Sequence, residues 1–420
     1  MYKNLFDERC FFMVNKLEEY AHLLIEVGLN VQKGQYLIIN SPVDCAYFAR
    51  LCVKAGYEAG AKQVIMQWRD DYISRQYWLN AADEVFDEVF PWDVERNLTL
   101  AKKNAARLSI SAADPENLVG VDPDRLDRAD KANGKANSEY TTMMMNSDFP
   151  WCVASIPIPA WAKKVFPGIP EEEAMEKLWN AIFDAVRITD EGGAVERWKQ
   201  HCDNLKNKRE ILNKYNFKSL HYTNSIGTDL TVELPEGHIW MAGSEFSKTG
   251  IEFVANIPTE EVFTAPKCDG INGTVAASKP LVIGGNIVDG FSMVLKDGKI
   301  TEVHAEKGEE YLKKAITLDE GASRFGEVAL VPYDSPISNS GILFLNTLFD
   351  ENASCHFAFG DSYPCIKGGD KMSKEELKKH GLNASMTHCD FMVGTKDLSI
   401  IGTTHDGREI PVFKNGNFAV

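Results

Sequence analysis

Gln35-Tyr36-Leu37-Ile38-Ile39-Asn40 and Ala61-Lys62-Gln63-Val64-Ile65-Met66 are two short, largely apolar runs near the start of the chain. Ser41-Pro42 ends the first run, and residues 46–55 read as a helix that residues 56–60, with two glycines, bring to an end. Short apolar runs that alternate with helices are typical of parallel strands joined by crossover helices. This stretch therefore predicts a mostly parallel, doubly wound α/β sheet.

The flanking sequence extends the same alternation to about residue 215. Apolar side chains recur at helical spacing in residues 15–27, and Gly28 ends that segment. Two further strands are predicted at residues 107–111 and 151–156, and two long polar helices at residues 171–186 and 194–215. We therefore predict a Rossmann-like α/β domain over residues 1–215.

The pattern changes at about Phe217. From there, short β-like runs are punctuated by Gly, Asn and Pro; strands are predicted at residues 220–222, 229–234, 291–295 and 300–303. Lys296-Asp297-Gly298-Lys299 has the residues of a tight hairpin turn. Helices are predicted at residues 309–316 and 373–380. Residues 216–420 are therefore predicted to form an α+β, mainly β C-terminal domain.

The composition and charge exclude several classes of function. With 420 residues, of which 44% are hydrophobic and 25% charged, the chain resembles an ordinary globular protein. Its net charge of −16 argues against nucleic-acid binding, which needs a basic face, and against attraction to anionic membranes. An acidic protein suits a cationic ligand, such as the free ammonium group of a peptide N-terminus.

The cysteines and the lack of long apolar segments indicate where in the cell the protein is expected. Nine cysteines are scattered without a CxxC pair, which is typical of free thiols in a reducing cytoplasm. Residues 1–9 contain no uninterrupted apolar segment, and no run of about 18 apolar residues occurs in the chain. We therefore expect a cytoplasmic location, with neither a signal peptide nor a membrane span.

Histidines close to acidic residues mark a candidate site. Two of the nine histidines stand in His356-Phe357-Ala358-Phe359-Gly360-Asp361-Ser362-Tyr363 and His388-Cys389-Asp390. A His-x-Asp sequence on a strand places both side chains on one face, because the side-chain period is two. Imidazole with carboxylate suits a divalent ion such as Zn²⁺, Co²⁺ or Mn²⁺, and the alternative is a surface ion pair. Cys355 and Cys389, each next to one of these histidines, would face the other way, so we expect them to pack.

Two acidic segments add ligands of the same kind. Pro258-Thr259-Glu260-Glu261-Val262-Phe263-Thr264-Ala265-Pro266 sets two glutamates between prolines, and Gly326-Glu327-Val328-Ala329-Leu330-Val331 sets one at the start of an apolar strand. Either segment alone would more often hold a salt-bridged structural acid, since a buried carboxylate needs a partner. Together the candidate ligands are Glu261, Glu327, His356, His388 and Asp390. Five such ligands exceed what one tetrahedral zinc requires and suit two ions roughly 3.5–4 Å apart.

The ordered motifs resemble the aminopeptidase T and aminopeptidase S family, also called the thermophilic metalloprotease family of dinuclear metalloaminopeptidases. The stretches that carry the resemblance are Pro258-Thr259-Glu260-Glu261-Val262-Phe263-Thr264, Gly326-Glu327-Val328-Ala329-Leu330-Val331, Asp350-Glu351-Asn352-Ala353, His356 through Tyr363, and His388-Cys389-Asp390. The motifs follow one another in the family's order and spacing, and the resemblance extends over nearly the whole chain.

The resemblance implies roles for individual residues. A pair of divalent ions per subunit, drawn from Zn, Co, Mn and Mg, would be bound by Glu261, Glu327, His356, His388 and Asp390. Tyr363 would be a ligand or an electrophile for the tetrahedral intermediate, and the predicted catalytic residues are Tyr363 and Glu261. The family's spacing favours Glu261 over Glu260. Glu351 matches an acidic position of the family, and whether it is a direct ligand, orients His356 or is a structural acid stays open.

The resemblance also implies an architecture and an activity. The architecture is an N-terminal α/β domain, a C-terminal domain that encloses the metals in a cavity, and a homodimer. The activity is removal of single N-terminal residues from short peptides with a free N-terminus, through a hydroxide that bridges the two ions. Two alternatives stay open: a non-catalytic small-ligand-binding protein with a structural metal cluster, and a metal-dependent amidohydrolase of non-peptide substrates.

Overall fold

A computed structural model describes residues 2–283 and 286–420 of the protein, with side chains described from Met13 onward. Residues 1–9, where no signal peptide is predicted, and Cys10 therefore lie outside the described side chains. The chain forms two compact units, Met1–His201 with Ser244–Pro258, and Cys202–Gly243 with Thr259–Val420. The domain boundary near residue 215 stays a prediction.

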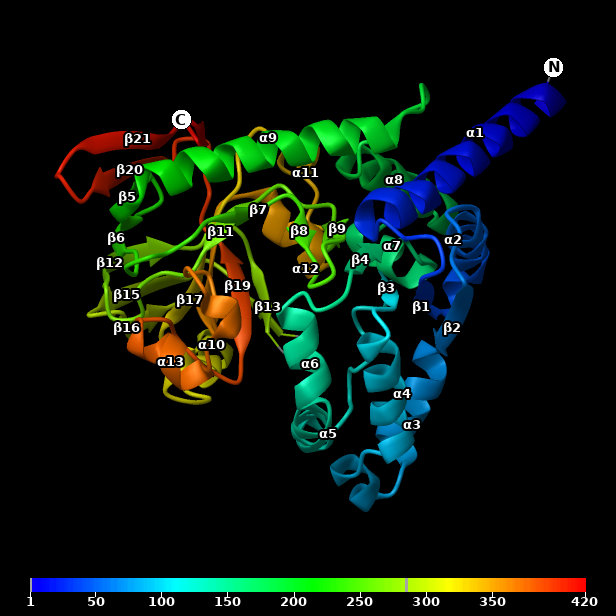
Figure 1. Cartoon of the computed structure of the whole chain (residues 1–420), viewed down its shortest axis with the longest axis horizontal. Coiled ribbons are helices and arrows are strands. Elements are labelled where there is room, and N and C mark those ends of the chain that lie inside the picture. The colour runs from blue at the N-terminus through cyan, green and yellow to red at the C-terminus, as the bar shows by residue number, and fades with distance from the viewer. Residues whose placement is uncertain (1, 284–285) are drawn as a thin grey trace. The chain divides into compact units, whose positions relative to one another are not determined.

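The first unit contains a five-stranded parallel sheet with the strand order β10-β4-β3-β1-β2, of which Figure 1 labels β1 to β4. Its strands are β1 (Tyr36–Pro42), β2 (Gln63–Arg69), β3 (Ala106–Ser111), β4 (Trp151–Ser155) and β10 (Asn256–Ile257). Leu37, Ile39 and Leu108 are fully buried, as expected for parallel strands covered on both faces. The predicted α/β sheet is confirmed, and β10 joins it from sequence beyond residue 215.

Helices connect these strands, as the doubly wound pattern requires. They are α1 (Tyr2–Leu23), α2 (Ala46–Glu58), α3 (Asp71–Asn80), α4 (Pro91–Lys102), α5 (Pro123–Ala136), α6 (Ser138–Met145), α7 (Pro159–Val165), α8 (Glu171–Ala185) and α9 (Ala194–Tyr215). A proline begins α4, α5 and α7, where its missing N–H costs no helical hydrogen bond. A short hairpin, β8 (Glu245–Phe246) with β9 (Glu252–Phe253), completes the unit. α9 begins in the first unit and ends in the second.

The second unit is built mainly of antiparallel strands. Its larger sheet has eight strands in the order β16-β15-β12-β6-β5-β20-β21-β22. These are β5 (Phe217–Thr223), β6 (Asp229–Glu233), β12 (Ile271–Ala276), β15 (Ser292–Lys296), β16 (Lys299–His304), β20 (Ser399–Thr404), β21 (Glu409–Lys414) and β22 (Asn417–Phe418). The hairpin predicted between β15 and β16 is present; Asp297 and Gly298 take φ values of 49° and 75°, as this turn demands.

A five-stranded antiparallel sheet with the order β19-β18-β17-β11-β7 positions the candidate site. Its strands are β7 (Met241–Ala242), β11 (Val262–Thr264), β17 (Phe325–Leu330), β18 (His356–Gly360) and β19 (His388–Met392). The unit also has the hairpin β13 (Leu281–Ile283) with β14 (Asn286–Val288), and the helices α10 (Glu309–Ala315), α11 (Pro336–Ser340), α12 (Thr347–Asp350) and α13 (Lys374–Lys379).

One hydrophobic core joins the two large sheets of the second unit. Leu220 and Val232 from the larger sheet belong to the same buried cluster as Val328, Phe357 and Phe391 from the smaller one. The predicted α+β, mainly β fold of the C-terminal region is therefore confirmed. Among the residues that the structure describes, no helix is long and apolar enough to cross a membrane.

Candidate metal centre

The five-stranded sheet has one apolar face and one polar face. In β18, Phe357 points into the core, whereas its neighbours His356 and Ala358 lie on the opposite side, because side chains alternate along a strand. Ala358 is paired with Glu327 of β17 on one side and with Asp390 of β19 on the other. Residues paired in register share a face, so the sheet presents these carboxylates and His356 together.

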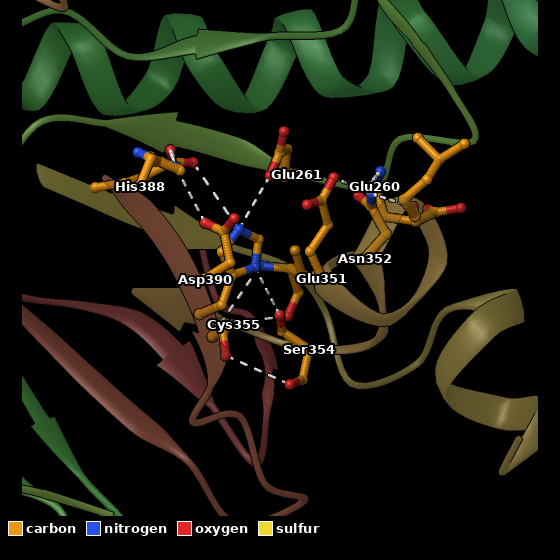
Figure 2. A network of polar contacts seen from close by, with 12 residues as sticks. Glu260, Glu261, Glu351, Asn352, Ser354, Cys355, His388 and Asp390 are labelled. Atoms are coloured by element: carbon orange, nitrogen blue, oxygen red, sulfur yellow. Dashed lines mark hydrogen bonds and ion pairs between the residues drawn. The ribbon is translucent and has the colours of Figure 1, made fainter. Parts of the chain in front are cut away.

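Two histidines and three carboxylates converge on this face. His356 Nε2 lies 3.3 Å from Glu261 Oε2 and 3.9 Å from Glu327 Oε1. His388 Nε2 lies 3.3 Å from Glu327 Oε2 and 3.2 Å from Asp390 Oδ1. Glu327 therefore contacts both imidazoles, one through each carboxylate oxygen. Figure 2 labels Glu261, His388 and Asp390 of this cluster.

The ligand atoms form two groups that share one residue. Glu261, Glu327 and His356 make up the first group, and Glu327, His388 and Asp390 the second. Within each group the three ligand atoms lie within 4.8 Å of one another. A carboxylate shared between two such groups is compatible with two neighbouring ions.

Backbone carbonyls fix the orientation of both imidazoles. His356 Nδ1 lies 3.2 Å from the carbonyl oxygen of Ser354, and His388 Nδ1 lies 2.8 Å from that of Asp361. A carbonyl accepts only, so in each ring Nδ1 carries the hydrogen. When the ring is neutral, this leaves the Nε2 lone pair directed at the carboxylates, as a metal-binding histidine requires.

Glu351 and Asn352 border the two groups without belonging to either (Figure 2). Asn352 is fully buried, accepts a hydrogen bond from the Glu260 N–H at 2.8 Å and donates one to the Leu348 carbonyl at 3.0 Å. Its amide nitrogen lies 3.5 Å from Glu351 Oε1. Asn352 therefore joins the segment that precedes β11, where Glu261 lies, to the segment that holds Glu351.

Burial and neighbouring charges shift the pKa values of the acidic residues of the site. Burial, followed by the charges of Asp390 and Glu261, holds the pKa of Glu351 well above its usual range. Burial also raises the pKa of Glu327, against the hydrogen bond from His388. The pKa of Asp390 lies below its usual value, because the hydrogen bond and charge of His388 outweigh the effect of burial.

The two imidazoles respond in the opposite way from isolated buried histidines. Burial alone would lower both pKa values, but the neighbouring carboxylates dominate. The hydrogen bond and charge of Glu261 raise the pKa of His356 to about 10, and Asp390 and Glu327 raise that of His388 to about 12. Both imidazoles are therefore protonated at neutral pH when no cation is bound.

The charge of the site fits divalent cations. The four carboxylates of Glu261, Glu327, Glu351 and Asp390 face only two imidazoles, and burying unbalanced negative charge is costly. Mixed nitrogen and oxygen donors are ligands that Zn²⁺, Co²⁺ and Mn²⁺ accept. The residues present therefore fit a pair of such ions, which would replace the protons on the imidazoles.

Tyr363 lies beside the candidate ligand His388. Its ring packs edge-on against the His388 imidazole, with centroids 5.9 Å apart and an interplanar angle of 78°. Burial, followed by the charges of Glu327 and Asp390, raises the pKa of Tyr363 well above its usual value. The hydroxyl therefore carries its proton at neutral pH and can donate a hydrogen bond.

Two cysteines next to the candidate histidines, and a further histidine, lie away from the two ligand groups. Cys355 is buried in the core on the apolar side, and Cys389 packs partly against the same core. His238 is buried beside the sheet, hydrogen-bonded through Nδ1 to the Pro235 carbonyl, and burial lowers its pKa to about 4.

The structural role of Asn352 was not predicted from the sequence, although this residue stands in Asp350-Glu351-Asn352-Ala353. The available signal was an amide next to a candidate acid.

Comparison with known proteins agrees with this geometry. The family model described as thermophilic metalloprotease (M29) matches residues 13–418. The chain belongs to this family. Aminopeptidase AmpS of Bacillus subtilis (strain 168) is 47% identical over 96% of this chain and 98% of its own length. Aminopeptidase T of Thermus thermophilus is 40% identical over 96% of this chain and 98% of its own length.

A solved structure extends the similarity to three dimensions. The structure of wild-type AmpT from Thermus thermophilus matches with a TM-score of 0.90 and 40% sequence identity. The match covers 97% of this chain and 99% of that chain. As a member of the thermophilic metalloprotease family, the chain is an enzyme that hydrolyses peptide bonds with the help of metal, as the resemblance of its motifs predicted.

Proposed function

We propose that the chain is an aminopeptidase that uses a pair of divalent ions to release single N-terminal residues from short peptides. The observation that carries the proposal is the pair of ligand groups that share Glu327. The names of the relatives from Bacillus subtilis, Geobacillus stearothermophilus and Thermus thermophilus, all aminopeptidases, support the substrate class.

In this proposal each ion has three protein ligands, and Glu327 is a ligand of both. One would be held by Glu261, Glu327 and His356, and the other by Glu327, His388 and Asp390. Zn, Co, Mn and Mg are the candidate metals, because mixed donors do not distinguish them and availability decides. When bound, the pair of ions would supply Lewis acidity and would lower the pKa of a water between them, so that it could serve as the bridging hydroxide.

The protein's own groups handle protons and developing charge. The carboxylate of Glu261 accepts the proton that the water loses when it becomes the hydroxide nucleophile, and delivers it to the departing amine as the C–N bond breaks. Tyr363 keeps its hydroxyl proton at neutral pH and donates a hydrogen bond to the oxyanion that forms on that carbonyl. Glu351 adds a carboxylate beside the metal ligands, where it would attract the substrate's ammonium group or complete the ligand set.

The acidic surroundings explain a requirement for a free N-terminus. A peptide's α-ammonium group brings a positive charge next to a buried excess of carboxylates, whereas an acylated N-terminus brings none. Short peptides therefore bind with their first residue at the metal ligands. This arrangement yields one residue per cleavage.

Hydrolysis by metal-stripped protein, with and without added Co²⁺, Zn²⁺, Mn²⁺ or Mg²⁺, tests the proposal. The substrates are aminoacyl-p-nitroanilides and short peptides, and the control is the same peptide N-acetylated. We expect metal to restore cleavage of free but not of blocked N-termini. Folded protein that binds two ions and cleaves nothing would favour a structural metal cluster. Cleavage confined to non-peptide amides would favour an amidohydrolase.

We also propose that the chain forms a homodimer, as the resemblance implies, and that it is located in the cytoplasm. The eight described cysteines are free, which suits a reducing compartment. Light scattering coupled to size-exclusion chromatography measures the mass directly. A single mass of twice 46.9 kDa supports the dimer, and a mass of 46.9 kDa at micromolar concentration contradicts it.

A further inference from the structure

The face of the sheet that carries the metal ligands also carries large apolar side chains. Phe263 is in register with Ala329, which is in register with His356, so Phe263 lies on the face that carries His356, and it stands two residues after Glu261. Phe263 is paired in register with Met241 of β7 and with Ala329 of β17. The metal ligands and these apolar residues therefore occupy neighbouring positions on one surface.

Aromatic contacts link the two sets of residues. The ring of Phe263 packs edge-on against that of Tyr363, with centroids 5.6 Å apart and an interplanar angle of 60°. Tyr363 in turn packs against the imidazole of His388. A line of ring contacts thus leads from a metal ligand to Phe263.

These apolar side chains are only partly buried. Ile239, Met241, Phe263 and Tyr363, which we call the apolar patch, rest on a small buried cluster and keep part of their own surface exposed. Beneath the patch, Ala265, Cys365, Ile366 and Leu382 are nearly inaccessible. The apolar patch beside the candidate metal ligands is therefore supported by a buried cluster and keeps some of its own surface accessible.

The position of the cleaved bond decides which part of the substrate the apolar patch can contact. In an aminopeptidase the metal ligands face the α-amino group and carbonyl of the first residue, so that residue's side chain must lie within a few ångströms of them. An apolar wall there favours a large apolar side chain over a small or charged one.

We propose that Phe263, together with Met241 and the ring of Tyr363, contacts the side chain of the peptide's first residue and sets a preference for large apolar residues. This inference rests on the proposed aminopeptidase function. Phe263 is the largest wholly apolar side chain of the patch, so it makes the main contribution to selectivity.

The test compares selectivity between substrates rather than activity alone. kcat/KM is measured for Leu-, Phe- and Ala-p-nitroanilide with metal-loaded wild type, Phe263→Ala and Phe263→Leu. We expect Phe263→Ala to lower the ratio of kcat/KM for Leu over Ala by about tenfold or more, because one methylene in an apolar site already discriminates by about that factor. Phe263→Leu should retain most of the preference.

Val262→Ala is the matched control. Val262 is the preceding residue of the same strand, but it is fully buried on the apolar side of the sheet. Its truncation should lower the unfolding temperature while leaving the Leu-to-Ala ratio unchanged. Calorimetric binding of the free amino acids L-leucine, L-phenylalanine and L-alanine gives a second readout, with L-leucine weakened selectively in Phe263→Ala.

The outcomes separate this inference from the function on which it rests. An active wild type whose Leu-to-Ala ratio is unchanged in Phe263→Ala, or moves equally in Val262→Ala, overturns the role of Phe263 and leaves the aminopeptidase proposal intact. A folded, metal-loaded wild type that cleaves no substrate overturns both.

Discussion

The two faces of the sheet formed by β19, β18, β17, β11 and β7 share one backbone and differ in chemistry. In β18 the two faces come from adjacent residues: Phe357 is fully buried in the core, and His356 beside it faces Glu261 and Glu327. The apolar face gains stability from burial. The polar face holds more carboxylates than cations and, without metal, costs stability.

This difference indicates how the fold offsets the repulsion between the carboxylates of the site. Tightly packed rings on one side fix the positions of the strands, and the strands hold like charges together on the other side. Phe357, for example, packs against Tyr222 and Phe325 at centroid distances of 5.0 and 5.3 Å. Substitutions on the two faces should therefore separate function from stability.

The largest effect is expected for His356→Ala on the polar face. It removes one ligand of the group formed with Glu261 and Glu327, so kcat/KM should fall by about a thousandfold or more, or about 4 kcal/mol. Bound metal, measured by elemental analysis, should fall while the circular dichroism spectrum stays the same. The matched control is Cys355→Ala, the buried neighbour on the other face. Equal losses of activity in both variants would refute the separation of the faces.

Phe357→Ala tests the apolar face. Removing a fully buried phenylalanine should lower the free energy of unfolding by about 3–5 kcal/mol, because the neighbouring rings cannot close the cavity. Urea unfolding followed by tryptophan fluorescence measures this loss. At temperatures where the variant stays folded, it should bind two equivalents of metal like the wild type. Loss of metal binding by folded Phe357→Ala would show that the two faces are coupled.

Much of this two-faced sheet could be predicted from the sequence. The alternation of polar and apolar residues in His356-Phe357-Ala358-Phe359-Gly360 already assigns each side chain to a face, and His388-Cys389-Asp390 does the same. Strands β1 to β4 and helices α2, α8 and α9 of the first unit were also predicted to within a few residues, because apolar periodicity and glycine or proline stops mark them locally. Helices α3 to α7 were not predicted, and α1 begins thirteen residues before the predicted helix.

The rest depends on contacts between residues distant in sequence. No local signal pairs β10, at residues 256–257, with β4 of the first sheet, nor sets β17 between β11 and β18. The carbonyl oxygens of Ser354 and Asp361 that orient the imidazoles belong to the backbone, so their side chains give no hint of them. The contact between Phe263 and Tyr363 likewise depends on the fold.

A third histidine, His238, extends the comparison, because it lies near the sheet and forms no ion pair with a carboxylate among the described residues. Burial lowers the pKa of His238 to about 4, whereas the carboxylates raise those of His356 and His388. The unfolded chain protonates His238 near pH 6.5 and the folded chain does not. The contribution of His238 to the free energy of unfolding is therefore fully present above pH 6.5. It is lost as the pH falls toward 4, by up to about 3 kcal/mol.

His238→Asn tests this effect, since the asparagine amide can replace the Nδ1 donor to the Pro235 carbonyl without titrating. Urea unfolding of metal-free protein at pH 7 and pH 4.5 measures the acid-induced loss of stability in wild type and variant. We expect the variant to lose less than the wild type by about 2–3 kcal/mol. An identical loss in both proteins would mean that His238 is already protonated in the folded state.

The smallest effect is expected at Asn352, which is buried like a core residue but joins two segments of the polar face. Asn352→Leu removes the acceptor of the Glu260 N–H and the donor to the Leu348 carbonyl, a loss of about 1–3 kcal/mol. Because the Glu260 N–H lies next to Glu261, we also expect kcat to fall about tenfold with both ions still bound. Asn352→Asp keeps the acceptor and should preserve more of kcat. If both variants lose stability but neither loses kcat per bound metal, Asn352 supports the fold and not the positions of the carboxylates.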